Sequence, residues 1–263
     1  MRALVTRPAE DAARTAAGLA AHGVDGVLAP LLEIEPVAGR GVDLAGVRAL
    51  LVTSANGARA LAAATERRDL LVLAVGDASA RTAREAGFRA VEAAGGDVDS
   101  LAALVRTRLA PHEGALLHVA GRERAGDLVA LLAPDGFTVW RAVLYRARPV
   151  EALPDAAAVA LRDETLDAVL LYSPRTAGTF VRLVCAAGLA PSCARLAAIC
   201  LSEAVADVAR ALPWHRVVVA AAPTEDELFA ALAAAGPATL TAADASASLA
   251  GAACVAPRPT GKA

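Results

Sequence analysis

The chain is 263 residues long, with 56% hydrophobic residues, 3% aromatic residues and a formal net charge of −2. Its length favours two domains of ordinary size, and its alanine-rich composition predicts aliphatic cores. The slightly acidic balance gives no electrostatic basis for binding nucleic acid, and no apolar run approaches the length of a membrane span. No charged segment precedes a signal-type apolar stretch, so we expect a cytoplasmic protein that binds neither nucleic acid nor membrane.

The cysteines and the single lysine narrow the possible chemistry. Cys185, Cys193, Cys200 and Cys254 form no C-x-x-C pair and have no histidine at zinc-like spacing, so we interpret them as small core residues or tail thiols. Lys262, beside the C-terminus, is the only lysine. A Schiff-base or phosphate-loop lysine inside the fold is therefore excluded unless the tail folds back.

Short apolar runs, polar turns and amphipathic helical patterns follow one another along most of the chain. The expected strands cover residues 3–6, 49–53, 71–75, 116–119, 168–172, 196–201 and 217–220. Each run is followed within a few residues by a helical pattern. This order is typical of parallel βα units and predicts an α/β protein.

The turns after these strands carry residues that begin helices. They are Thr6-Arg7-Pro8, Ser54, Asp77, Ser173-Pro174, Ser202 and Pro223-Thr224, the last with a capping-box glutamate at Glu227. Each one alone is explained equally well as an ordinary helix terminus. Because ligands of open α/β sheets bind beyond the carboxyl ends of the strands, the turns together mark a candidate site.

Two segments depart from the βα pattern, residues 32–37 and 143–150. Both alternate polar and apolar residues and end at a proline, which predicts extended chain. On either side, residues 51–62 and 169–180 repeat the order of strand, serine turn and helix. We therefore predict two similar parallel-sheet α/β lobes of flavodoxin-like type, joined by a two-stranded antiparallel linker, with the active site in the cleft between the lobes. The predicted bounds are 1–36 with 149–236 for the first lobe, 38–146 for the second, and 237–263 for a disordered tail.

Common catalytic signatures are missing. Residues 121–127 have phosphate-loop spacing but Asp127 where a lysine is needed, and no G-x-G-x-x-G follows the first strand. Neither Ser54 nor Ser173 lies in a G-x-S-x-G turn. His118 falls within a strand and is expected to be a core or edge residue rather than a base. We expect no metal, no other cofactor and no covalent nucleophile.

What remains is a set of hydrogen-bond donors at the strand ends. Helix N-termini, hydroxyls and the arginines Arg7, Arg122, Arg124 and Arg175 suit a ligand with several carboxylates or phosphates. Several helix N-termini at roughly 0.3–1 kcal/mol each would hold a polyanion even on a slightly acidic protein. The alternative is that the arginines form a solvated rim.

Eight motifs follow one another along the chain: ALVTRPAED, LLEIEP, VTSANGARAL, AVGDASARTAREAGF, VLYRARP, LLYSPRTAGTF, ICLSEAVA and APTEDELFAAL. In these motifs and their order the sequence resembles the uroporphyrinogen-III synthase family. Each motif alone is weak, and their order together with the two extended segments makes the resemblance specific. It implies a cofactor-independent lyase of tetrapyrrole and haem biosynthesis. Such an enzyme closes the polycarboxylate hydroxymethylbilane, a linear tetrapyrrole, to uroporphyrinogen III with ring D inverted, through azafulvene and spiro intermediates.

The resemblance also assigns roles to residues. Tyr145 matches the family's tyrosine on the returning linker, whose hydroxyl is suggested to help the substrate hydroxyl leave. A phenol is protonated at neutral pH and suits this role. Glu203 departs from the family pattern and would oppose a carboxylate, so Ser202 rather than Glu203 should face the ligand. The positions expected to bind substrate are Arg7, Ser54, Ser79, Arg122, Ser173, Ser202 and Thr224.

Two other functions fit parts of the sequence. A non-catalytic two-lobed ligand-binding or sensory module for an anionic small molecule would share the architecture, although the missing export signal argues against the periplasmic kind. A nucleotide- or flavin-binding protein is disfavoured by the missing glycine fingerprints. The synthase hypothesis predicts a monomer whose partner is a small polycarboxylate, and the product isomer distinguishes it from both alternatives.

Overall fold

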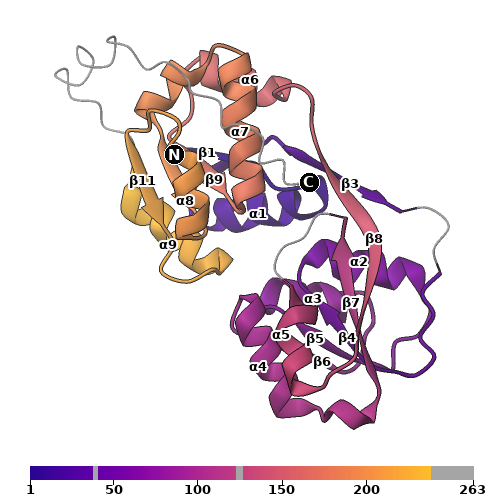
Figure 1. The fold of residues 1–263 in the computed structure, drawn as a ribbon. Helices are drawn as coiled ribbons and strands as arrows, with labels where there is room; N and C mark the ends of the chain where they lie inside the picture. Colours follow the sequence, from indigo (N-terminus) through magenta and orange to yellow (C-terminus); the bar gives the residue numbers. More distant parts are fainter. Residues whose placement is uncertain (38–40, 123–126, 238–263) are drawn as a thin grey trace. The chain divides into compact units, whose positions relative to one another are not determined.

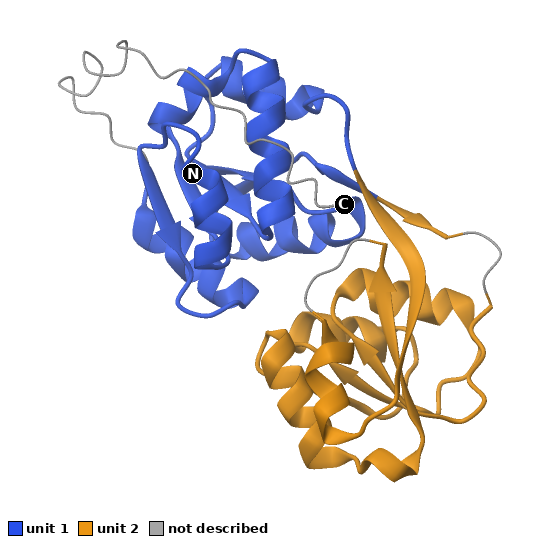
Figure 2. Ribbon diagram, in the orientation of Figure 1, with its two compact units in different colours: residues 1–33, 149–263 blue, residues 34–148 orange. Residues whose placement is uncertain are grey.

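The computed structural model describes residues 1–37, 41–122 and 127–237 (Figure 1). The chain divides into two compact units, coloured separately in Figure 2. Unit 1 comprises Met1–Glu33 and Pro149–Ala263, and unit 2 comprises Ile34–Arg148. Arg124 and almost all of the expected tail lie outside the described residues. Each unit has its own sheet and its own hydrophobic core.

Unit 1 is built on a five-stranded sheet whose neighbouring strands all run parallel, in the order β11-β10-β9-β1-β2. Counted along the chain, this is the 2-1-3-4-5 order of flavodoxin-like sheets. The elements are β1 (Arg2–Val5), α1 (Ala9–Ala21), β2 (Asp25–Leu28), α6 (Asp155–Arg162), β9 (Ala168–Leu171), α7 (Pro174–Ala186), η3 (Ala190–Arg195), β10 (Ala197–Cys200), α8 (Glu203–Ala209), β11 (Arg216–Val219) and α9 (Glu225–Ala235).

Helices cover both faces of this sheet because successive strand residues point to opposite sides. Leu4 and Val169 pack on one face against α6, α7 and α8, where Phe180 is fully buried. Val5 and Leu170 pack on the other face against α1 and α9. Unit 1 is therefore a three-layer sandwich with an aliphatic core, as the composition predicts.

Unit 2 has a six-stranded sheet in the order β3-β8-β7-β4-β5-β6, in which the pairs from β8 to β6 are parallel. Helices α2 and α3 contribute to the core on one face, and α4 and α5 to the core on the other. The elements are β3 (Leu32–Pro36), β4 (Val47–Val52), α2 (Ala55–Ala64), β5 (Leu71–Ala74), α3 (Asp77–Glu85), β6 (Val91–Ala93), α4 (Val98–Arg108), η1 (Pro111–Glu113), β7 (Ala115–Gly121), α5 (Leu128–Leu132), η2 (Ala133–Asp135) and β8 (Val139–Pro149).

The two extended segments predicted from the sequence are β3 and β8, and they are neighbours in the sheet. The N–H of Val37 donates to the carbonyl of Leu144 at 2.9 Å, and the N–H of Val150 donates to the carbonyl of Leu31 at 3.1 Å. From residue 31 to residue 37 of the first segment, the partner in the second segment changes from residue 150 to residue 144, so the two segments run antiparallel. The predicted pairing is confirmed.

The predicted similarity of the two halves is also confirmed. In unit 2, three successive βα units place β4, β5 and β6 side by side, and in unit 1 three successive units do the same with β9, β10 and β11. Strands β2 and β6 were not expected from the sequence. Both are short, and their sequences, DGVL and VEA, lack the continuous apolar run that marks the expected parallel strands.

Candidate functional site

In each sheet the strand order reverses at one point, and the carboxyl ends of the two strands at such a point form the usual ligand crevice of open α/β folds. In unit 1 the switch point lies between β1 and β9, and in unit 2 it lies between β4 and β7. The residues that follow these strands are the candidates for binding a ligand. They include the predicted site residues Arg7, Ser54, Arg122 and Ser173.

Ser54 connects a helix N-terminus to the predicted catalytic tyrosine. Its backbone is extended, and its Oγ accepts the N–H of Gly57 at 2.9 Å, which confirms the predicted cap of α2. The same Oγ lies 2.8 Å from the hydroxyl oxygen of Tyr145. A serine hydroxyl has one proton and two lone pairs, so it accepts from Gly57 and still shares a hydrogen bond with the phenol.

Tyr145 reaches Ser54 through a break in the register of β8. Ala120 of β7 pairs with Val143, whereas the next residue, Gly121, pairs with Tyr145, so Leu144 is the extra residue of a bulge. Leu144 is buried in the core, while Tyr145, within β8 and beside the last residue of β7, is half-buried. Bulges redirect side chains and are frequent beside active sites.

Gly121 leaves room for the ring of Tyr145. A Cβ at position 121 would lie 3.0 Å from the ring Cζ and 3.2 Å from the phenolic oxygen, which is too close for an undisturbed contact. The N–H of Arg122 donates to the carbonyl of Tyr145 at 2.9 Å, while the Arg122 side chain is exposed. The end of β7 therefore fixes Tyr145 through both its ring and its backbone.

The third predicted residue of unit 2 belongs to α3. Ser79 is in the first turn of this helix and is only 4% exposed. The prediction that Asp77 caps α3 is wrong, because Gly76 occupies the N-cap position and Asp77 is already helical. Gly76 is favoured there because a Cβ would lie 3.2 Å from Cα of Gly96. In the first helical turn the Asp77 carboxylate still complements the helix dipole.

Hydroxyl residues begin three helices of unit 1. Ser173 Oγ accepts the N–H of Thr176 at 3.1 Å, and Thr224 Oγ1 accepts the N–H of Glu227 at 3.3 Å. Both predicted caps are confirmed. Ser202 occupies the N-cap position of α8, but its side chain makes no capping hydrogen bond. The helix therefore does not use the Ser202 hydroxyl.

Charged side chains at this end of the sheet of unit 1 are already paired. Nη1 of Arg7 donates to Oε1 of Glu225 at 2.9 Å, and Cζ of Arg7 lies 4.5 Å from the centroid of the Tyr172 ring. Glu203 forms an ion pair of 2.6 Å with Arg210. Arg210, the C-cap residue of α8, also pairs with Asp207, so one guanidinium partly compensates two carboxylates.

The chain also matches a known protein family over most of its length. The family model HEM4, described as uroporphyrinogen-III synthase HemD, matches residues 13–230. The chain belongs to the uroporphyrinogen-III synthase family. It is accordingly a lyase of tetrapyrrole and haem biosynthesis that cyclises hydroxymethylbilane to uroporphyrinogen III.

Solved structures of uroporphyrinogen-III synthases share the fold. The enzyme from Helicobacter pylori is 16% identical, with a TM-score of 0.57, and the match covers 89% of this chain and 99% of that one. A mutant enzyme from Thermus thermophilus is 19% identical, with a TM-score of 0.52, and the match covers 89% of this chain and 98% of that one. At these identities the likeness shows the fold alone. No curated protein sequence matches the chain significantly.

Several residues around the predicted site of this synthase-family chain were not expected from the sequence. In the sequence, Gly121 was noted only as the first glycine of a phosphate-loop spacing that was rejected because Asp127 replaces the lysine. Tyr172 and Glu225 each lie next to a predicted site residue, and their adjacency to Ser173 and Thr224 is the signal that could have found them.

Three buried titratable groups, His118, Cys193 and Cys200, have pKa values that make them poor bases or nucleophiles. Burial lowers the pKa of His118 to about 4, and this strand residue is 5% exposed, which confirms it as a core residue. Burial raises the pKa of the Cys193 and Cys200 thiols to about 12, so they remain protonated and weakly nucleophilic. Both are core residues as predicted, and Cys254 lies outside the described residues.

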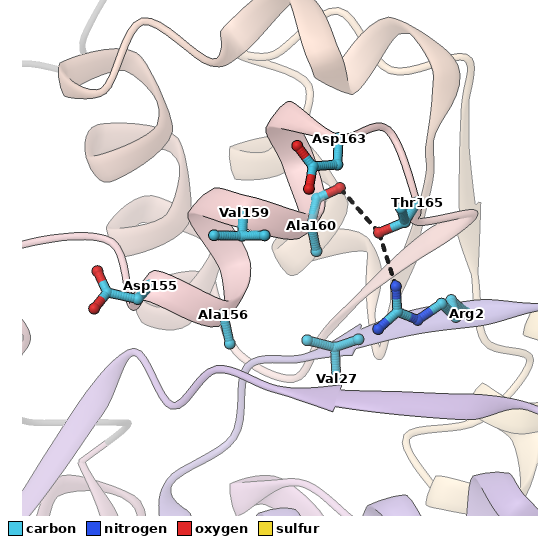
Figure 3. A pocket seen from close by; sticks show the side chains of 8 residues that line it. All are labelled: Arg2, Val27, Asp155, Ala156, Val159, Ala160, Asp163 and Thr165. Carbon is cyan, nitrogen blue, oxygen red and sulfur yellow. Dashed lines mark hydrogen bonds between the residues drawn. The ribbon is translucent and has the colours of Figure 1, made fainter.

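The pocket in Figure 3 lies along α6, beside the edge strand β2 of unit 1. Its volume is about 370 Å³. Arg2 and Thr165 lie at the amino ends of β1 and β9, whereas Asp155 is the first residue of α6 and Val27 lies within β2, so the pocket extends along the helix. None of the predicted site residues lines it. The pocket is therefore separate from the carboxyl-end site where parallel sheets bind ligands.

Among residues 1–37, 41–122 and 127–237, histidine, cysteine and acidic side chains form no group of three that could hold a metal ion. Within the same ranges no helix combines the length and apolarity needed to cross a membrane.

Proposed function

We propose that Tyr145 is the catalytic proton donor of the ring closure. The observation that carries this assignment is the 2.8 Å contact between its hydroxyl and Ser54 Oγ, at the topological switch point of unit 2. A catalytic acid must be held at a fixed point and must keep its proton until the substrate arrives. The bulge in β8, Gly121 and the Ser54 cap together support the first requirement, and the phenol meets the second.

The proposed reaction transfers the phenolic proton to the hydroxymethyl oxygen of the substrate as its C–O bond breaks. Water leaves, and an azafulvene cation and a Tyr145 phenolate remain. The substituted carbon of ring D attacks the cation to give the spiro intermediate, which fragments and closes again with ring D inverted. Loss of the proton from the newly bonded ring carbon restores aromaticity, and that proton returns to the phenolate.

Ser54 has a defined part in this cycle. When its hydroxyl donates to the phenolic oxygen, it stabilises the phenolate that forms as the substrate hydroxyl departs. Ser54 in turn accepts the N–H of Gly57 in the first turn of α2, and the positive end of the helix dipole favours negative charge at this point. The arrangement therefore supports a proton donor whose conjugate base is stabilised.

We assign the substrate carboxylates to hydroxyls and helix N-termini on both units. The assigned side chains are Ser79 and Arg122 of unit 2 and Ser173, Ser202 and Thr224 of unit 1. The substrate is flexible and also closes without inversion when unaided, so the protein's main task is to hold the substituted carbon of ring D near the cation. Arg7 already forms an ion pair with Glu225 and is not assigned to a substrate carboxylate.

We also propose, from the sequence expectations, that the chain works as a monomer in the cytoplasm. Sedimentation of the purified full chain tests the first statement, and fractionation of the source cells tests the second. A stable dimer would contradict the first statement and a membrane-bound fraction the second, and neither result would change the proposed chemistry.

Product analysis tests the proposed activity. The full chain is incubated with hydroxymethylbilane, and the porphyrins obtained after oxidation are separated into type I and type III isomers. Type III product in excess of a protein-free control supports the proposal. Type I product alone would overturn it and would favour a non-catalytic ligand-binding module.

A further inference from the structure

Unit 1 contains a cluster of polar side chains that the proposed chemistry does not use. Arg7 follows β1, Tyr172 follows β9, and Glu225 is the first residue of α9. Tyr172 immediately precedes Ser173, and Glu225 immediately follows Thr224. The cluster therefore adjoins two of the turns assigned above to substrate carboxylates, both within one unit.

The guanidinium of Arg7 is the centre of this cluster. It donates from Nη1 to Glu225 Oε1 at 2.9 Å, and its Cζ lies 4.5 Å from the centroid of the Tyr172 ring. The Arg7 side chain is only 12% exposed and that of Glu225 only 20%. Thr15 of α1 donates its hydroxyl proton to the same Glu225 oxygen at 2.6 Å. The first residue of α9 is thus attached to both α1 and the turn after β1.

The charges of the cluster are balanced internally. Oδ2 of Asp11 lies 3.5 Å from Nη2 of Arg7, and Oδ1 of Asp11 lies 3.0 Å from Nη2 of Arg14. Two guanidinium groups therefore face the carboxylates of Asp11 and Glu225. Poorly exposed charges are stable only when they are paired in this way. Arg7 is a poor candidate for direct contact with a substrate carboxylate, because Glu225 already occupies that place.

Tyr172 contributes its ring rather than its hydroxyl. The hydroxyl is buried and forms no hydrogen bond of normal geometry among the described residues, although Thr15 and Arg7 lie beside it and favour its ionised form. Burial raises the pKa of Tyr172, so the phenol stays protonated. A buried hydroxyl without a partner is unfavourable. The contact of this side chain with defined geometry is the cation–π interaction of its ring with Arg7.

We infer that Arg7 is a positioning residue that holds the turns of Ser173 and Thr224 in a fixed geometry by binding Tyr172 and Glu225 at once. This group of three, Arg7, Tyr172 and Glu225, is called the Arg7 clasp below. The inference rests on the proposed function, because that proposal assigns the two turns to substrate carboxylates.

Arginine suits this position for a geometric reason. A planar guanidinium stacks on an aromatic ring through its face and donates hydrogen bonds through its edge at the same time, whereas a lysine ammonium does not. Turns that are ordered in advance lose less conformational entropy when a ligand binds. The Arg7 clasp therefore increases substrate affinity and does not affect the rate of the bond-breaking step at Tyr145 in unit 2.

The test combines amide exchange with steady-state kinetics on the full chain. Glu225→Gln removes the negative charge of the clasp at nearly constant side-chain volume. Arg7→Lys keeps the positive charge but replaces the planar guanidinium by an ammonium group. The matched control is Asp25→Asn, which breaks an ion pair of 2.8 Å between Asp25 and Arg2 at the amino ends of β1 and β2, away from the clasp at the carboxyl ends. NMR exchange is followed at the capped amides of Thr176 and Glu227, with the capped amide of Gly57 in unit 2 as internal reference.

Both clasp variants are expected to speed exchange at Thr176 and Glu227 by about fivefold relative to Gly57. They are expected to raise KM by a similar factor with kcat changed less than about twofold. Combining the two substitutions should add little to the larger single effect, because both break the same group of contacts. Asp25→Asn should change neither the exchange ratio nor KM.

Unchanged exchange at both amides would overturn the clasp, whatever product the enzyme forms. Faster exchange with an unchanged KM, or an equal rise of KM in Asp25→Asn, would overturn its role in substrate binding. If the unmodified chain gave type I product alone, the proposed function would fail, and the exchange measurement would still decide whether Arg7 fixes the two turns.

Discussion

The hydroxyl of Tyr145 lies 2.8 Å from Oγ of Ser54, a residue 91 positions earlier in the chain. Ser54 also caps α2 through the N–H of Gly57. A proton donor on the last strand of unit 2 is thus coupled to the N-terminus of the first helix of that unit. This coupling makes the proposed mechanism open to direct tests.

Replacement of Tyr145 by phenylalanine is expected to lower kcat by about 100-fold, because a positioned general acid typically contributes that much or more. The ring is kept, so the packing against Gly121 should survive. Steady-state kinetics give the rate, and circular dichroism with thermal unfolding shows whether the fold is intact. Turnover at the original rate would remove Tyr145 from the mechanism without affecting the family assignment.

Ser54→Ala and Ser173→Ala each remove a helix cap, one in each unit. Loss of such a cap lowers the free energy of unfolding by about 1 kcal/mol, so the Tm of both variants should fall by a few degrees. Their kinetics should differ. Ser54→Ala should lower kcat because Tyr145 loses its partner, whereas Ser173→Ala should mainly raise KM. Equal kinetic effects in the two variants would contradict the separation between the catalytic pair and the binding turn.

Addition of a methyl group at Gly121 should displace the catalytic ring. The new Cβ would meet Cζ of Tyr145 at 3.0 Å, so Gly121→Ala should lower kcat at least about tenfold through misplacement of the phenol. Gly178→Ala in α7 is the matched control. A Cβ there finds its nearest neighbour, Cγ1 of Val208, at 3.7 Å, and alanine favours a helix. An active Gly121→Ala enzyme would show that the close approach is unimportant.

His118 predicts a pH dependence of stability. Its pKa is lowered by burial to about 4 in the folded state, against about 6.5 in an unfolded chain. Between these values the unfolded state binds more protons, so stability falls as the pH drops from about 6.5 to 4 and does not fall further from this cause below 4. His118→Gln should flatten this part of the curve of unfolding free energy against pH, measured by urea titration. The same slope in both proteins would rule out His118 as the cause.

The repeating βα units were predictable because their signals are local. Buried strands such as β9 and β10 are continuous apolar runs, and caps such as Ser173 follow them at once. Strands β2 and β6 were not predicted because they are short and contain polar residues or glycine in place of a continuous apolar run. The cap of α3 was misassigned because Asp77 has the usual capping chemistry, whereas the deciding feature is the close approach of Gly96 to Gly76.

The site was less accessible to sequence reasoning, since its contacts join distant residues. The resemblance to the synthase family selected Tyr145 and Ser54 separately, and nothing local to either position predicts their hydrogen bond. The bulge at Leu144 shifts the register by one residue, which an alternating pattern does not reveal. Arg7 looked like a free cation because its partner Glu225 is 218 residues away.

The position of β1 between β2 and β9 has a consequence for synthesis on the ribosome. β1 is made first, but β9 begins only at Ala168, after the whole of unit 2 has been translated. Residues 34–148 are contiguous and can fold as they emerge, whereas β1 keeps one edge unpaired until β9 has been made. Slow translation between residue 148 and β9 would therefore prolong the time in which β1 can mispair.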